Sequence, residues 1–199
     1  MQINNSMTEP YVKVNKDPSG LATIIFFHPK HNSLPSDILS KLAQTITEAG
    51  EDDAVKLIVL KSGGDRTFCS GASFTELISI NDLETGKKFF SGFANVINAC
   101  RKCPKLIIGR VQGKAVGGGV GVASAVDFCL ATKFASAKLS ELNLGIGPFV
   151  VGPAVERKVG VSAMSQMTIN ADHFYTASWA LEKGLYAEIY EDVDALDEG

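Results

Sequence analysis

The residues with the clearest chemical potential lie in one glycine-rich stretch, from Gly113 to Pro148. The apolar run Leu106–Val111 before it predicts a buried strand, and three consecutive glycines, Gly117–Gly119, open a small apolar run typical of a buried helix. Glycine at such a junction lets the backbone approach a ligand closely. The first N–H groups of a helix have no partner within the helix, and the helix dipole favours negative charge there. The junction can therefore hold a phosphate, or an oxyanion that forms during a reaction.

Two common nucleotide-binding motifs are absent from this junction. It lacks the Gly-Lys-Ser/Thr ending of a phosphate-binding loop, and its glycines do not follow the Gly-x-Gly-x-x-Gly spacing of a dinucleotide-binding fold. The structural alternative is a glycine-rich turn that simply packs closely against a neighbouring element. The glycines alone do not distinguish a ligand site from such a turn.

A second predicted strand also ends in a glycine-containing turn. The apolar run at residues 57–61 predicts a buried strand, and the segment 62–74 after it contains three glycines. Two turns of this kind can direct two backbone N–H groups at one oxygen atom, which is the arrangement that stabilises an oxyanion.

With both turns in view, the chain resembles the crotonase family, the enoyl-CoA hydratases and isomerases. The family carries a phenylalanine followed by a Gly-Ala-Asp turn, here Phe68-Cys-Ser-Gly-Ala-Ser73, and a triple glycine at a helix start, here Gly117–Gly119. A third family segment, Pro/Ser-Glu-x-x-Leu-Gly-x-x-Pro, matches Ser140–Pro148, and an early family motif matches Asn32-Ser-Leu34. The resemblance extends over roughly Val12 to Tyr190, and three ordered motifs make it specific.

The spacing of apolar residues predicts alternating strands and helices. Alternation at residues 11–15 and 21–27, around a turn at 17–20, predicts a β-hairpin. Helical spacing predicts helices at 36–48, 81–102, 120–126, 152–158, 164–169 and 177–183, and short strands are expected at 128–132, 137–139 and 186–190. This rhythm indicates an α/β or mixed fold, and the resemblance implies a spiral of ββα units rather than a Rossmann sheet. Phe89, Phe90 and Phe93 are expected in the core, with Phe90 or Phe93 at the edge of an acyl pocket.

We expect a flexible N-terminal lead at residues 1–10 and one crotonase-like core domain at residues 11–199. The family has further C-terminal helices that help to close the active site and to build trimers, and the chain stops before them. By resemblance, a form that includes those helices is expected to be a homotrimer or hexamer, and the 199-residue chain to associate less tightly.

Composition excludes several classes of function. The net charge of −3 argues against a nucleic-acid surface, no apolar run is long enough to span a membrane, and the N-terminus lacks a signal-peptide pattern. Cys100 and Cys103 form a CxxC pair, but no second pair completes a zinc site, and the pair closes a predicted helix where a redox motif would open one. We therefore predict reduced thiols, no metal, and a cytoplasmic location.

The resemblance assigns the reacting groups. A thioester carbonyl becomes an enolate when a proton leaves its α or γ carbon, or when water adds at the β carbon, and the negative charge sits on the carbonyl oxygen. By resemblance, the N–H groups of Ala72 and Gly118 stabilise that oxygen, and losing one such donor typically costs about 3 kcal/mol. Glu141 matches one of the family's two catalytic acids and would move the proton. The alternative for Glu141 is a surface or capping carboxylate.

The substrate is expected to be an acyl-CoA thioester, with coenzyme A as part of the substrate and no separate cofactor. By resemblance, the backbone at Ser70, Gly71 and Gly117 lines the coenzyme A site. Lys30, in the loop after the predicted hairpin, is the candidate for a phosphate contact, and a solvated surface lysine is the alternative.

The second family acid lies two residues after the triple glycine, where this chain has Gly121. Hydratases of the family hold water with both acids, so a chain with one acid resembles the isomerases. Ser73 also replaces the family's aspartate, and the bulky segment Pro148–Pro153 predicts a reshaped acyl pocket. Double-bond isomerisation is the expected activity. Water addition, a related lyase, decarboxylase or thioesterase reaction, and non-catalytic acyl-CoA binding stay open.

Overall fold

A β-hairpin forms one edge of the main sheet. The computed structural model describes residues 9–199, so most of the predicted N-terminal lead, residues 1–8, lies outside the described residues. Strands β1 (Tyr11–Lys16) and β2 (Leu21–Phe27) pair antiparallel, which confirms the predicted hairpin. The carboxylate of Asp17 accepts the N–H groups of Ser19 and Leu21 and so closes the turn between the two strands.

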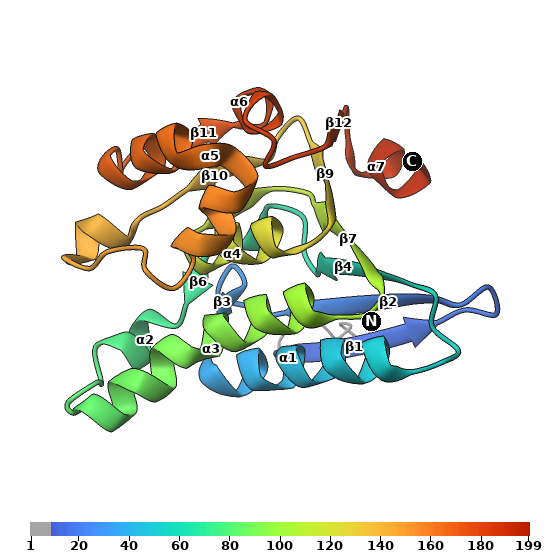
Figure 1. The fold of residues 1–199 in the computed structure, drawn as a ribbon, viewed down its shortest axis with the longest axis horizontal. Helices are drawn as coiled ribbons and strands as arrows, with labels where there is room; N and C mark the ends of the chain where they lie inside the picture. The colour runs from blue at the N-terminus through green and yellow to red at the C-terminus, as the bar shows by residue number, and fades with distance from the viewer. Residues whose placement is uncertain (1–8) are drawn as a thin grey trace, which may run out of the picture.

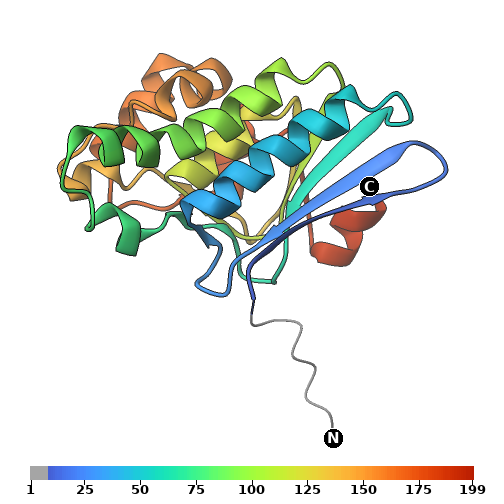
Figure 2. The same ribbon diagram turned by 90° about the horizontal axis from the view of Figure 1, so that it is seen from below.

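The main sheet has six strands in the order β1-β2-β4-β7-β9-β12, and every pair after the hairpin is parallel. Its later strands are β4 (Leu57–Ser62), β7 (Leu106–Val111), β9 (Phe128–Thr132) and β12 (Glu188–Tyr190). Helices α1 (Ser36–Glu51) and α3 (Leu83–Lys102) lie side by side across one face of this sheet (Figures 1 and 2). Because side chains alternate along a strand, every second residue of β2 and β4 is buried beneath the helices.

Two smaller sheets carry the strands that follow those of the main sheet. The four-stranded sheet has the order β11-β10-β8-β5, and a two-stranded sheet pairs β3 with β6. Their bounds are β3 (Ser33–Leu34), β5 (Thr67–Cys69), β6 (Gly71–Ala72), β8 (Lys114–Val116), β10 (Ser136–Lys138) and β11 (Tyr175–Thr176). The chain repeatedly runs from the main sheet to the four-stranded sheet and then into a helix, as in β7-β8-α4. The predicted spiral of ββα units is therefore confirmed.

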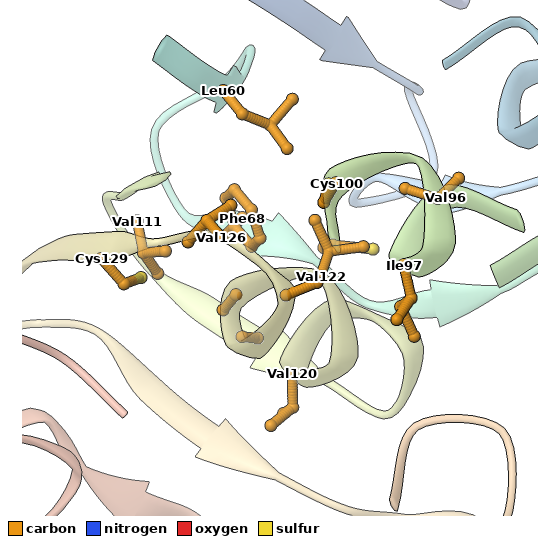
Figure 3. Close-up of a cluster of buried hydrophobic side chains, with 14 of the residues drawn as sticks. Leu60, Phe68, Val96, Ile97, Cys100, Val111, Val120, Val122, Val126 and Cys129 are labelled. Carbon is orange, nitrogen blue, oxygen red and sulfur yellow. The ribbon is translucent and has the colours of Figure 1, made fainter. Parts of the chain in front are cut away.

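Helix α4 (Gly118–Ala125) is enclosed by the rest of the fold. Figure 3 shows side chains of α3 and of strands β4, β5 and β9 gathered around it, including Phe68, Val96 and Cys129. Val120 and Val122 of α4 are fully buried. A helix that is surrounded on all sides has no polar face, which explains the uniformly small, apolar sequence of this segment.

The helix boundaries agree only in part with those predicted. Helix α5 (Gly152–Ile169) is broken at Gly160, whose backbone is non-helical, which agrees with the two helices predicted at 152–158 and 164–169. Asp82 caps α3 by accepting the N–H of Thr85, so the helix begins at Leu83, two residues after the predicted start at residue 81. A short helix, α2 (Phe74–Leu77), was not predicted; the hydroxyl of Ser73 caps it.

The last two helices complete the described chain. Helix α6 (Ala177–Glu182) follows β11, and α7 (Val193–Glu198) lies on the face of the main sheet opposite α1 and α3 (Figure 2). The buried guanidinium of Arg110, on β7, donates two hydrogen bonds of 2.8 Å to the carboxylate of Asp197. This two-point bond fixes α7 against the sheet.

All four cysteines lie in the described residues and all are free thiols, as predicted. Cys69, Cys100 and Cys129 are buried, and burial raises the pKa of each thiol to about 12. They are therefore un-ionised, packed as small apolar groups. Within residues 9–199, no helix combines the length and the apolar character needed to cross a lipid bilayer.

Asn32 joins two loops beneath the small sheets, and its removal should destabilise the fold. Its buried side chain accepts the N–H of His28 and donates to the carbonyl oxygens of Gly63 and Thr67, at 2.7, 2.9 and 2.8 Å. We expect Asn32→Ala to lower the free energy of unfolding by about 2–4 kcal/mol, because it leaves buried polar groups without partners. Urea titration measures the change, with exposed Asn15→Ala as control. Equal stability of the two variants would contradict the assignment.

Candidate active site

A cavity of about 330 Å³ lies where the two glycine turns meet. Six of the seven predicted site residues line it: Ser70, Gly71, Ala72, Gly117, Gly118 and Glu141. They come from four different elements, namely the end of β5, strand β6, the start of α4 and the segment after β10. The fold therefore brings together residues that are up to 71 positions apart.

The two turns approach each other more closely than side chains would allow. Gly117 has φ +52° and ψ −115°, a backbone conformation open to glycine, and its N–H donates to the carbonyl oxygen of Lys138 at 2.9 Å. Gly71 has φ +94°, and a Cβ atom placed on it would lie 3.3 Å from the carbonyl oxygen of Val116 and 3.9 Å from the nitrogen of Gly118. The first turn of α4 thus lies directly beside strand β6.

Close packing also explains the rest of the triple glycine. A Cβ atom on Gly118 would lie 2.5 Å from the ring of Phe93, and one on Gly119 would lie 2.5 Å from the carbonyl oxygen of Cys69. Both distances are well inside van der Waals contact. The glycines therefore serve the structural role that we considered as the alternative, and two of them also line the cavity.

Glu141 begins a 3₁₀ helix, Glu141–Leu144, that follows β10. A Cβ atom on Gly117 would lie 3.2 Å from Glu141 Oε1, so the carboxylate sits directly over the second glycine turn. Glu141 Oε2 is buried and has no hydrogen-bond partner among the described residues. Burial raises the pKa of the Glu141 carboxyl group, and no other ionisable side chain of the described chain lines the cavity. A buried carboxyl group with a raised pKa is suited to accept and return a proton.

The family model for enoyl-CoA hydratase/isomerase matches residues 16–198. The chain belongs to the enoyl-CoA hydratase/isomerase family. It is 30% identical over 199 residues to the short-chain-enoyl-CoA hydratase of Clostridium acetobutylicum, covering 99% of this chain and 73% of that protein. It is 29% identical to the crotonyl-CoA hydratase of Syntrophomonas wolfei, covering 89% of this chain and 68% of that protein.

Solved structures agree with this membership. The enoyl-CoA hydratase of Mycobacterium smegmatis superposes with a TM-score of 0.87 at 26% identity, over 96% of this chain and 73% of that one. An enoyl-CoA hydratase of Bacillus anthracis gives a TM-score of 0.86 at 25% identity, over 94% and 72%. As a member of an enzyme family that acts on acyl-CoA thioesters, the chain carries its cavity at the junction of the two family glycine motifs.

Lys30 is the one predicted site residue that does not line the cavity. It is exposed in the loop after β2, and its backbone N–H donates to Nδ1 of His28 at 3.3 Å. A contact between Lys30 and a coenzyme A phosphate stays a prediction.

The position of the second family acid is closed by apolar side chains. Gly121 lies inside buried α4, and a Cβ atom on it would lie 2.6 Å from Val151 Cγ1 and 2.9 Å from Ile97 Cδ1. Val151 also lines the cavity. In this member of the family, valine and isoleucine thus fill the space into which a longer side chain at position 121 would have to extend.

Much of the cavity wall is apolar, and part of it was predicted: Pro148, Val150 and Val151 belong to the segment expected to reshape the acyl pocket. Phe90 and Phe93 line it, as expected for at least one of them, and Phe89 does so as well. Helix α2 adds Phe74 and Leu77, and the segment after Glu141 adds further apolar side chains: Leu144, Ile146, Pro148, Val150 and Val151. The signal for α2 was present in Ser73, a good helix cap, but a four-residue helix has too few residues to show a period.

Replacing Glu141 should stabilise the protein at neutral pH. Its pKa is raised on folding, so the native state binds more protons than the unfolded state and stability falls as the pH rises through the native pKa. Glu141→Gln removes this penalty. The gain should appear as a higher Tm for Glu141→Gln than for the parent at about pH 7. Calorimetry should show the gain shrinking as the pH falls below about 4, because the carboxyl group then becomes protonated in the unfolded state as well. A loss of stability at neutral pH would contradict the prediction.

Proposed function

We propose that this chain isomerises the double bond of an enoyl-CoA thioester, with Glu141 as the group that moves the proton. The observation that carries the proposal is that Glu141 is the sole ionisable side chain lining the cavity in the described chain. A second acid has no room beside Gly121. One carboxylate suffices to move a proton between two carbons of the same substrate, whereas water addition in this family uses two acids.

The reaction follows from the positions of these groups. The thioester oxygen accepts hydrogen bonds from the N–H groups of Ala72 and Gly118, at the two turns that line the cavity. The Glu141 carboxylate removes a proton from the α carbon of a 3-enoyl thioester, and the electron pair moves into a dienolate with its charge on the thioester oxygen. The same carboxyl group then returns the proton at the γ carbon, which gives the 2-enoyl thioester. An apolar wall excludes water and suits a hydrocarbon acyl chain.

Water addition is the second candidate, and the names of the relatives favour it. Both curated relatives described above are named hydratases. For this chain, hydration would require the single carboxylate to activate water without a second acid, in a cavity whose wall is mainly apolar.

One experiment separates these candidates from a protein that only binds. The protein is incubated with 3-enoyl-CoA and 2-enoyl-CoA esters in D₂O, and products are identified by mass spectrometry and NMR. Isomerisation converts 3-enoyl to 2-enoyl ester, with deuterium at carbon to the extent that the proton held by Glu141 exchanges with solvent before its return, and hydration yields a 3-hydroxyacyl ester. A calorimetric binding signal without either product would indicate a non-catalytic acyl-CoA-binding protein. No product and no binding at millimolar ester would overturn the proposal.

We further propose that a form with the family's C-terminal helices assembles as a trimer or hexamer, that the protein is cytoplasmic, and that it uses no cofactor apart from the coenzyme A of its substrate. Family membership supports the proposed assembly and the proposed acyl-CoA substrate. Light scattering on the longer form that showed a monomer would count against the proposed assembly.

A further inference from the structure

We propose that Asn143 is a positioning residue for Glu141, because its side-chain amide ties the segment that carries the carboxylate to the loop after α5. We call this segment, Glu141–Leu144, the Glu141 turn. The inference rests on the proposed function, in which Glu141 moves the proton.

Among the residues that the structure describes, the backbone of the Glu141 turn hydrogen-bonds only to its own neighbours in the chain. Its hydrogen bonds join Asn143 to Ser140, Gly145 to Leu142 and Ile146 to Glu141, at 3.0–3.2 Å. Apolar burial adds little, since Leu142 and Leu144 are 45% and 48% exposed. On its upstream side the turn is held by β10, where the carbonyl oxygen of Lys138 accepts the N–H of Gly117 and Leu139 is buried. The downstream side of the turn has no such backbone bond to the glycine turns among the described residues.

The amide of Asn143 provides the missing connection. Its Nδ2 donates to the carboxylate of Asp172 at 2.7 Å and to the carbonyl oxygen of Ala171 at 3.2 Å. Within residues 9–199, these are the only side-chain hydrogen bonds between residues 141–146 and the rest of the chain. Both hydrogens of the amide are used, which sets the direction of the side chain as well as its position.

The Glu141 carboxylate depends on this connection because no other side chain among residues 9–199 hydrogen-bonds to it. Its Oε2 atom has no partner among the described residues, and its Oε1 atom lies over the backbone of Gly117. The position of the Glu141 carboxylate therefore follows the position of the Glu141 turn. Proton transfer needs the carboxylate within hydrogen-bond reach of the reacting carbon, so a small shift of the turn should slow the reaction more than it weakens binding.

The test breaks the connection from both ends. Asn143→Ala changes a residue of the cavity wall, whereas Asp172→Ala removes the same bond from a residue outside the wall. We expect each to lower kcat for deuterium exchange about tenfold, with KM changed less than twofold. The double variant should be no slower than the slower single variant, since both remove one interaction. Gln166→Ala, an exposed residue near the end of α5 without a hydrogen bond to the turn, should match the parent.

A swapped pair separates positioning from general stability. Asn143→Asp places a second carboxylate beside Asp172 and should be the slowest single variant. Adding Asp172→Asn restores a donor and an acceptor in reversed order and should recover most of the lost kcat. Additive losses in the double alanine variant, or no recovery in the swapped pair, would overturn the inference.

A second readout does not depend on turnover. In protein labelled with ¹³C at glutamate carboxyl groups, the Glu141 resonance is identified by its absence in Glu141→Gln. A turn that moves outward exposes the carboxylate, so its pKa should fall toward that of an ordinary glutamate in Asn143→Ala and Asp172→Ala and stay raised in Gln166→Ala. An unchanged pKa in both single variants would refute positioning. If the parent turns over no ester, the proposed function fails while this titration still decides the role of Asn143.

Discussion

Glu141→Gln should abolish deuterium exchange into an enoyl-CoA ester while leaving ester binding nearly intact. The amide keeps the shape of the carboxyl group but cannot accept a proton, and general acid–base catalysis typically contributes about 10²–10⁴-fold to a rate. We expect a loss in that range for kcat. The measurement is solvent deuterium incorporation read by mass spectrometry, with calorimetry for binding.

The matched control is Glu156→Gln, an exposed glutamate on α5 that does not line the cavity. It should exchange at the parent rate. The parent's kcat/KM should also fall with decreasing pH at a higher pH than an ordinary glutamate would give, because burial raises the pKa of Glu141. Rapid exchange that persisted in Glu141→Gln would show that another group is the base.

Gly119→Ala should disrupt the site through the fold. The added Cβ atom would lie 2.5 Å from the carbonyl oxygen of Cys69 and 2.8 Å from its Cβ atom, so α4 and β5 must separate. The Cys69 carbonyl oxygen belongs to the backbone and cannot rotate away as the end of a side chain can. We therefore expect a loss of about 3 kcal/mol or more in the free energy of unfolding. For a chain of this size, that corresponds to a Tm lower by roughly 6–12 °C.

Gly86→Ala provides the matched control, since it is also a helical glycine. A Cβ atom there meets only Ile80 Cγ2, at an ordinary 3.4 Å, so the higher helix propensity of alanine should stabilise α3 by about 0.5–1 kcal/mol. The same substitution should thus have opposite signs in two helices. Thermal unfolding of both variants decides the matter, and a stabilised Gly119→Ala would contradict the close contact between the turns.

The sequence by itself determined the fold and most of the candidate site. The two glycine turns and the Glu141 segment are local motifs, because a positive φ or an approach to backbone selects glycine at a fixed place in the chain. Gly71 and Gly117 both have positive φ, and both line the cavity. The hairpin and the long helices follow from periods of apolar residues that are also local.

The tertiary structure decided what depends on contacts between distant segments. The local motif marks the place of Glu141 in the chain, but its raised pKa arises from burial among elements that are far away in the chain. The hydrogen bond from Asn143 to Asp172 joins residues 29 positions apart, and no local sequence pattern predicts it. Lys30 lies outside the cavity wall, and helix α2 is too short to show a period. Local backbone constraints select particular residue types, so they can be recognised in the sequence. Burial, long-range hydrogen bonds and the apolar side chains that fill the space beside Gly121 depend on how distant segments pack together.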